Sequence, residues 1–318
     1  KQRLSWQVLD DFAEAAVQAG VARTEDINRG DNEDADYFED NQRKAWRWNT
    51  SKAFLRPIKQ RANLTIWHST HVNRLLFESQ EGTPCCTGAE LLREGNILKV
   101  TASKEVVLSA GAIGSPQILQ LSGIGAPELL KQHGIDVVSA LPGVGENLQD
   151  HLQIRSVYKV KGAKTLNTMA NSLVGKAKIG LEYVLKRSGP MSMAPSQLCI
   201  FTRSSEEYQH ANIEYHVQPL SLEAFGQPLH SFPAITASVC NLNPTSRGRV
   251  QIKSRDPQAA PAIEPNYLST AEDRKVAADS LRVTRRIAEQ QAFARYQPEE
   301  FKPGLEYQSD DDLAKLAG

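Results

Sequence analysis

Residues 105–151 read EVVLSAGAIGSPQILQLSGIGAPELLKQHGIDVVSALPGVGENLQDH, and this stretch decides the fold of the chain. Residues 106–108 are a short apolar run, typical of a strand buried on both faces of a parallel sheet. Residues 109–112 follow with no bulky side chain, and we expect Ser115 to cap a helix that begins at Pro116. Small residues in such a turn let a ligand approach the backbone, and helix-start amides favour an anion. A tight turn without any ligand is the alternative.

The same stretch carries a resemblance to a known family. Residues 111–125, GAIGSPQILQLSGIG, resemble the second sequence signature of the glucose-methanol-choline (GMC) family of FAD-dependent oxidoreductases, and residues 142–151, PGVGENLQDH, resemble the block that follows it there. The similarity is to choline-dehydrogenase-like and alcohol-dehydrogenase-like members. Further similar blocks extend over nearly the whole chain: 47–55 (RWNTSKAFL), 63–65 (NLT) leading to Val72, 244–250 (PTSRGRV) and 265–268 (PNYL).

Two parts of the family pattern do not occur in this sequence. The family begins with a Gly-x-Gly-x-x-Gly turn that holds the FAD pyrophosphate, whereas residues 123–125 and 143–145 both lack the third glycine. The family also places its catalytic histidine, with a partner histidine or asparagine, near its C-terminus. We therefore expect the chain to be an internal fragment of a longer protein, with its catalytic residues beyond Gly318.

The residue pattern predicts an α+β fold with an α/β part. The resemblance implies that the α/β part is a partial Rossmann-like FAD-binding domain and that the remainder is an antiparallel-sheet substrate domain with helices. We expect a helical and loop segment at 1–56 that links the FAD and substrate domains, and part of the FAD-binding domain at 57–153, with the family signature at 111–125. The substrate domain is expected at 154–318, truncated before the catalytic histidine region. Apolar periodicity predicts helices over 4–19, over 174–186, and from a cap at 270–273 toward Phe293. Predicted strands cover 64–67, 72–77, 89–92, 97–101, 106–108, 213–217 and 249–253.

The resemblance implies a set of cofactor contacts. Val72 falls where the family uses a backbone amide and carbonyl to hold the adenine edge, although a plain core valine is the alternative. Ala110 and Gly111 would lie along the FAD, because only small residues let the backbone approach it. Ser109 and Ser115 belong to the same turn and complete the predicted cofactor-binding set.

The substrate pocket is predicted from two amide side chains, those of Gln197 and Asn243. Gln197 falls where choline-oxidising members use a carboxylate, and a neutral amide does not offset a quaternary ammonium as well. This departure favours an uncharged alcohol, unless Gln197 merely caps a turn. Asn243 precedes a turn and would point into the same pocket. His151 resembles a catalytic base, but a structural hydrogen bond is the preferred interpretation, since the family keeps its base elsewhere.

Composition excludes several other classes of protein. The charges of the 37 basic and 37 acidic residues cancel. The sequence has no basic stripe with interleaved aromatic residues, so we do not expect a nucleic-acid partner. No stretch approaches the roughly 20 apolar residues of a membrane span. The four cysteines show neither a disulfide framework nor a zinc spacing, so we expect no metal and a reducing compartment. The expected location is cytoplasmic, with peripheral attachment at the inner membrane as the alternative.

The resemblance implies that the intact protein oxidises a primary alcohol to an aldehyde, with a hydride passing to flavin N5 and the electrons then to a quinone or oxygen. Choline dehydrogenase activity is one alternative, and a catalytically incomplete flavoprotein-like binding module is another. A nicotinamide-dependent dehydrogenase is disfavoured, because no glycine-rich phosphate loop occurs in a βαβ setting. A homo-oligomer is a further expectation.

Overall fold

The computed structural model describes residues 4–23, 30, 33–224 and 226–317. These residues form two compact units. The first unit contains Lys1–Pro57, His151–Thr245 and Thr270–Gly318, and the second contains Ile58–Asp150 and Ser246–Ser269. No helix of the described residues has the length and apolar character needed to cross a membrane.

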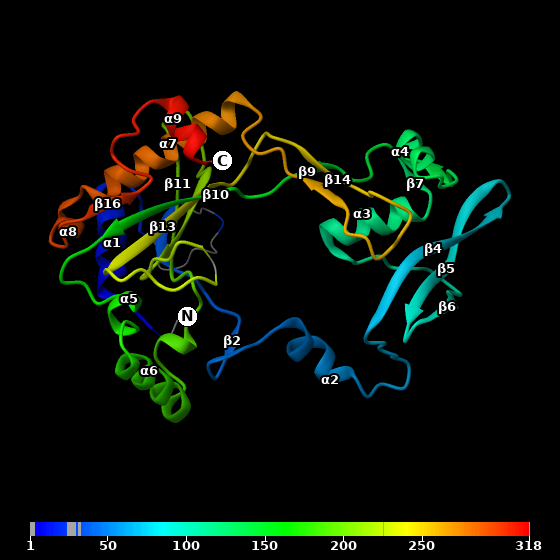
Figure 1. The fold of residues 1–318 in the computed structure, drawn as a ribbon, viewed down its shortest axis with the longest axis horizontal. Helices are drawn as coiled ribbons and strands as arrows, with labels where there is room; N and C mark the ends of the chain where they lie inside the picture. Colours follow the sequence, from blue (N-terminus) through cyan, green and yellow to red (C-terminus); the bar gives the residue numbers. More distant parts are fainter. Residues whose placement is uncertain (1–3, 24–29, 31–32, 225, 318) are drawn as a thin grey trace. The chain divides into compact units, whose positions relative to one another are not determined.

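The first unit is built on a six-stranded sheet in the order β1-β11-β12-β13-β10-β16 (Figure 1). Every pairing in it is antiparallel, as the alternating pattern of residues 213–217 predicts. Its central strand β13 is buried along nearly all its length. The strands are β1 Asp34–Tyr37, β10 Gln153–Lys159, β11 Leu198–Thr202, β12 Ile213–Gln218, β13 Ala234–Asn241 and β16 Glu299–Lys302.

Helices pack on one face of this sheet. Helix α1, Gln7–Gln18, buries Phe12 against Phe293 with ring centroids 5.2 Å apart, and it ends before Gly20, whose φ is +104°. Helix α7, Ala271–Ala288, packs on β13 and β10, and its cap Thr270 accepts a hydrogen bond from the Asp273 amide, as predicted. Phe293 lies in a separate helix, α8. The other helices are α5 Leu166–Met169, α6 Leu173–Lys186, α8 Gln291–Ala294, α9 Asp310–Ala317 and the 3-10 helix η2 Pro190–Ser192.

A short hairpin and two short helices follow β1. Strands β2, Gln42–Arg43, and β3, Trp46–Arg47, pair with each other. The π-helix η1, Ser51–Leu55, and helix α2, Arg56–Ile58, come next.

The second unit contains a three-stranded meander of β4 Thr70–Gln80, β5 Thr83–Arg93 and β6 Asn96–Thr101. The β4–β5 turn is made by Glu81 and Gly82, both at positive φ, a two-residue hairpin loop. The predicted strands at 72–77 and 89–92 are present as β4 and β5, and both extend further than predicted. The prediction for 64–67 is wrong, because these residues form no strand.

Two short sheets and two helices complete the second unit. Strands β7, Ile124–Gly125, and β8, Ser139–Ala140, form the single parallel pairing among the described residues. Strands β9 Glu146–Leu148, β14 Gly248–Gln251 and β15 Ala262–Glu264 form an antiparallel sheet. The helices are α3 Gly111–Leu121 and α4 Pro127–Gln132.

The structure corrects two predictions around α3. Residues 106–108 form no strand, and Val107 is 77% exposed, because no other described strand lies beside this run to pair with it. Helix α3 begins at Gly111, so Pro116 lies inside it rather than at its start. Ser115 is not the N-cap; its Oγ instead accepts a hydrogen bond from the Ala110 amide at 3.1 Å. The hydroxyl thus satisfies a helix-start amide from inside the first turns.

The α+β class is confirmed, and the division of the chain is discontinuous. The clustering of contacts groups Lys1–Pro57 with the unit that contains the six-stranded sheet. Residues 246–269 join the second unit, because β14 pairs with β9. The predicted roles of the domains in FAD and substrate binding concern function, and this division does not test them.

Candidate functional site

The bend between residues 109 and 111 is open to solvent. Ser109, Ala110 and Gly111 are all exposed, and Gly111 has a φ of +81°. A Cβ added to Gly111 would meet no atom within 4 Å. Glycine is therefore required here by the left-handed backbone and not by packing within the unit. The bend leads directly into the first turn of α3, where backbone amides point outward from the helix end.

Other glycines of this unit contrast with Gly111. A Cβ on Gly145 would lie 2.2 Å from the Val250 carbonyl oxygen, and one on Gly123 would lie 2.4 Å from the Asp136 carbonyl oxygen. These glycines permit close packing of the unit on itself. The open space beside Gly111 leaves room for a flat ligand, and the donor groups there suit the anionic part of a dinucleotide.

Val72 lies on β4, which is an edge strand of the meander. Alternate backbone groups of an edge strand point away from the sheet, so they can bind a ligand or another part of the chain. At Leu75 the backbone amide donates to Ser122 Oγ at 2.8 Å, and α3 packs against β4. This arrangement allows the backbone contact predicted at Val72.

A buried glutamine, which the sequence did not single out, fixes α3 in its unit. Gln120 is fully buried, and its Oε1 accepts from the Ile252 amide at 2.9 Å. Its Nε2 donates to the carbonyls of Val250 at 3.0 Å and Val144 at 3.2 Å. The family-like block at 142–151 is therefore tied to the helix that follows the open bend.

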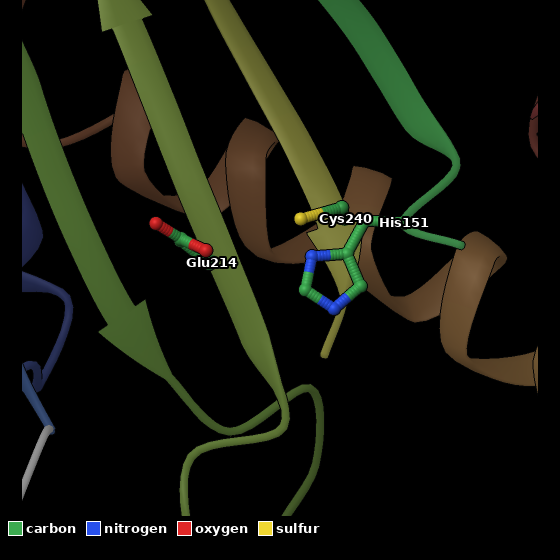
Figure 2. Close-up of side chains that lie close together, drawn as sticks. All are labelled: His151, Glu214 and Cys240. Atoms are coloured by element: carbon green, nitrogen blue, oxygen red, sulfur yellow. The ribbon is translucent and has the colours of Figure 1, made fainter. Parts of the chain in front are cut away.

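The six-stranded sheet of the first unit has one face covered by helix and a second face that carries polar groups. Tyr215 points to α7, where its hydroxyl bonds Thr284 Oγ1 at 3.0 Å and the Ser280 carbonyl at 3.2 Å. Its neighbour on β12, Glu214, points to the opposite face because side chains alternate along a strand. Figure 2 shows Glu214, Cys240 and His151 in front of the strands with the helix behind them.

These three side chains come together through the register of the sheet. Glu214 on β12 pairs directly with Cys240 on β13, and Cys240 pairs with Gln153, two residues after His151. One potential ligand atom from each residue lies within 4.8 Å of the other two. The sequence could not show this group, because its members are 63 and 26 residues apart along the chain.

Two members of this group already have polar partners. His151 Nε2 lies at a hydrogen-bond distance of 3.2 Å from the Leu242 carbonyl oxygen, and Glu214 Oε1 lies 3.4 Å from His216 Nε2. The His216 ring stacks on Phe38 with centroids 4.9 Å apart. The residue types could hold a transition-metal ion, but these bonds also account for the arrangement as a polar patch with a carboxylate at its centre. The carbonyl contact of His151 matches the structural role predicted for it.

Gln197 and Asn243 lie on the first unit in different surroundings. Gln197 is fully buried, and its Nε2 donates to the Ala194 carbonyl at 2.6 Å, which is the turn-capping alternative considered for it. Asn243 is exposed, and its backbone amide donates to Asn241 Oδ1 at 3.0 Å. Their assignment to a substrate pocket stays a prediction.

The family-like block 47–55 lines a cavity of about 750 Å³ in the first unit. Its lining includes Arg47, Trp48 and Phe54 together with residues 193–195. Asp40 also lines this cavity, and burial raises the pKa of its carboxyl.

Comparison with known proteins identifies the class of protein that these features define. A family model described as GMC oxidoreductase matches residues 3–153, and a second model with the same description matches residues 244–317. The chain belongs to the GMC oxidoreductase family.

Two bacterial proteins named oxygen-dependent choline dehydrogenase are among the relatives of this chain. The chain is 38% identical over 302 residues to the oxygen-dependent choline dehydrogenase of Photobacterium profundum. The aligned region covers 95% of this chain and 52% of the relative. The corresponding protein of Acinetobacter baumannii strain AYE is 38% identical over 305 residues, covering 95% of this chain and 54% of the relative. The chain thus spans about half the length of the curated relatives it matches.

Solved structures share the fold. Pyridoxine 4-oxidase from Mesorbium loti matches with a TM-score of 0.82 at 25% identity, over 98% of this chain and 56% of that one. Formate oxidase matches with a TM-score of 0.85 at 24% identity, over 98% of this chain and 59% of that one. The second likeness shows the fold alone.

Proposed function

We propose that the full-length protein uses FAD to oxidise a primary alcohol to an aldehyde. The observation that carries this proposal is the open, small-residue bend at 109–111 in a chain of the GMC family. FAD, when bound, accepts the hydride from the alcohol carbon at flavin N5. The residues present fit the cofactor, because space and outward-facing backbone groups coincide at the bend.

The proposed cofactor contacts belong to the second unit. The Ser109, Ala110 and Gly111 backbone would lie along the dinucleotide, and the Val72 backbone would hold the adenine edge. Ser115 would act indirectly, since its hydroxyl binds the Ala110 amide and so fixes the bend. The second unit is therefore proposed to contribute to FAD binding and the first to substrate binding.

The proposed substrate contacts lie on the polar face of the six-stranded sheet. Glu214 and His151, which lie close together on this face, would orient the alcohol there by hydrogen bonds. The group that takes the hydroxyl proton is proposed to be a histidine outside these 318 residues, as in the family pattern. Gln197 and Asn243 remain proposed pocket residues.

An absorption spectrum of the purified full-length protein tests the proposal. We expect flavin bands in the blue and near-ultraviolet, and their bleaching when a medium-chain primary alcohol is added without an acceptor. A product without flavin bands after reconstitution with FAD would refute the proposal and favour a binding module.

Choline is the second candidate substrate, and Glu214 favours it. The Glu214 side chain is 13% exposed and lies beside His151, so its carboxylate can offset a quaternary ammonium in a setting that water screens poorly. Because Gln197 donates to Ala194, its neutral side chain is weaker evidence against choline than the sequence indicated. Turnover of choline and of medium-chain alcohols with an artificial acceptor decides between them.

The electron acceptor is proposed to be a quinone or oxygen, and the protein a homo-oligomer in the cytoplasm or at the inner membrane. Peroxide formation in air, compared with reduction of a soluble quinone, distinguishes the acceptors. Light scattering after gel filtration measures the oligomeric state.

A further inference from the structure

Helix α6, Leu173–Lys186, presents an apolar stripe to solvent. Apolar side chains on a surface helix normally face the core, whereas these are between 59% and 85% exposed. The exposed side chains are Leu173, Val174, Leu181, Val184 and Leu185. Together with exposed Ala177 they span roughly 120° of the helix circumference at 3.6 residues per turn.

The opposite side of α6 holds the helix on its unit. Ile179 is the buried apolar residue there, and the Tyr183 hydroxyl donates to the Ala45 carbonyl at 3.2 Å. Glu182 accepts from Ser188 Oγ at 2.9 Å, and Ser172 caps the helix by accepting from the Gly175 amide at 3.0 Å. The last two bonds are local to the helix, so the burial of Ile179 and the Tyr183 bond orient α6 on the unit and turn the stripe outward.

Basic residues border the stripe on both sides. Lys178 follows Leu185 around the helix, and Lys176 lies beyond the other border next to Leu173. Residues 161–187 carry six basic side chains and one acidic side chain, Glu182, a surplus of five positive charges in a chain of zero net charge. Lysines in these positions can extend their ammonium groups past an apolar face that is buried in lipid.

An exposed tryptophan lies near the C-terminal end of α6. Trp46 is 52% exposed, and the guanidinium of Arg187 lies 5.1 Å from its ring centroid. The ammonium of Lys52 lies 5.7 Å from the same centroid. Tryptophan with basic neighbours is typical of the membrane–water interface, because the ring has an apolar body and a polar edge.

We propose that this face of α6 docks on an anionic lipid bilayer, with the helix lying in the plane of the surface. The 14 residues of α6 are too few for a span of roughly 20, and its opposite side is engaged with protein. Two copies meeting symmetrically through this face would bring like surpluses of charge together, which disfavours a second copy as the occupant. Docking of this kind does not depend on the oxidation chemistry.

Sedimentation of the full-length protein with vesicles tests the proposal. We expect binding to vesicles of phosphatidylcholine mixed with phosphatidylglycerol, weaker binding to phosphatidylcholine alone, and loss of binding in high salt. The triple variant Leu181→Ser/Val184→Ser/Leu185→Ser should lower the partition coefficient on the order of a hundredfold. The double variant Lys176→Gln/Lys178→Gln should lower it roughly thirtyfold, from about fivefold per lysine.

Matched controls carry the same chemical changes away from the stripe. Leu305→Ser removes another exposed leucine of the first unit, and Lys99→Gln removes an exposed lysine on β6 of the second unit. Both should bind vesicles as the unmodified protein does, and thermal unfolding should show all variants folded. Equal sedimentation with and without lipid, or full binding by the triple variant, overturns the proposal. A triple variant that only changes the oligomeric mass would instead identify a second copy as the occupant and also overturn it.

Discussion

Replacement of Gly111 by alanine separates a role in cofactor binding from a role in packing. The φ of +81° at this position disfavours any residue with a Cβ by about 1–2 kcal/mol, and alanine recovers about 0.4–1 kcal/mol by restricting the unfolded chain. The added Cβ meets no protein atom within 4 Å. We therefore expect Gly111→Ala to fold with a net loss of about 1 kcal/mol, a decrease of a few degrees in Tm.

Cofactor binding should respond far more strongly than stability. A methyl group placed against the dinucleotide costs about 1–3 kcal/mol of overpacking, which corresponds to an affinity for FAD that is weaker by roughly 5- to 150-fold. The assay is the flavin absorbance per mole of purified full-length protein, followed by titration of the flavin-free protein with FAD.

Gly82→Ala is the matched control for this change. Gly82 lies in the β4–β5 turn with a φ of +84°, and a Cβ there also meets nothing within 4 Å. The two variants should lose similar stability, and only Gly111→Ala should lose flavin. Equal flavin content in both variants would refute the conclusion that the bend lies along the cofactor.

Three further predictions concern the six-stranded sheet and the residues around it in the first unit. Glu214→Gln should raise KM for choline about tenfold and leave KM for an uncharged alcohol nearly unchanged, because only the cation needs the carboxylate. Steady-state kinetics with the two substrates measures both KM values. Equal increases in KM for the two substrates would contradict the prediction. Glu300→Gln should lower the free energy of unfolding by about 3–5 kcal/mol, as measured by denaturant unfolding. The reason is that the Glu300 side chain is 2% exposed and accepts two hydrogen bonds of 2.9 Å from Arg285. Glu264→Gln, which changes the exposed ion pair with Arg249, is the control and should show no measurable change. Burial raises the pKa of the Cys199 thiol from 9.0 to about 12, so its contribution to stability is complete below pH 9 and is lost as the pH rises toward 12. After alkylation near pH 8, mass spectrometry should find Cys85 and Cys86 modified before Cys199. Rapid labelling of Cys199 in the folded protein would contradict this order.

Local patterns predicted much of the secondary structure. The helices over 4–19 and 174–186 and the cap at Thr270 follow from side-chain spacing and capping residues, which act within a few positions of the chain. The wrong secondary-structure predictions concern segments whose structure also depends on contacts with other parts of the chain. Residues 106–108 have the composition of a buried strand, but a strand also needs a neighbour to pair with. Ser115 and Pro116 suggested a helix start, while the helix begins four residues before Ser115.

The candidate sites divide in the same way. The small-residue bend at 109–111 was found from composition, because the absence of side chains is itself the local signal. Glu214 was not, since nothing near it in the sequence indicates a site. Register places it opposite Cys240 and near His151, and register depends on the whole sheet.

The sequence by itself determined the family, the α+β class and the glycine-dependent bend, because motifs, periodicity and backbone freedom are properties of neighbouring residues. Only the tertiary structure decided that 246–269 joins the second unit, that Gln197 is used within a turn, and that α6 turns its apolar stripe outward. Each of these depends on contacts between segments far apart in the chain, and the free energy of such contacts is set by packing and register rather than by local preference.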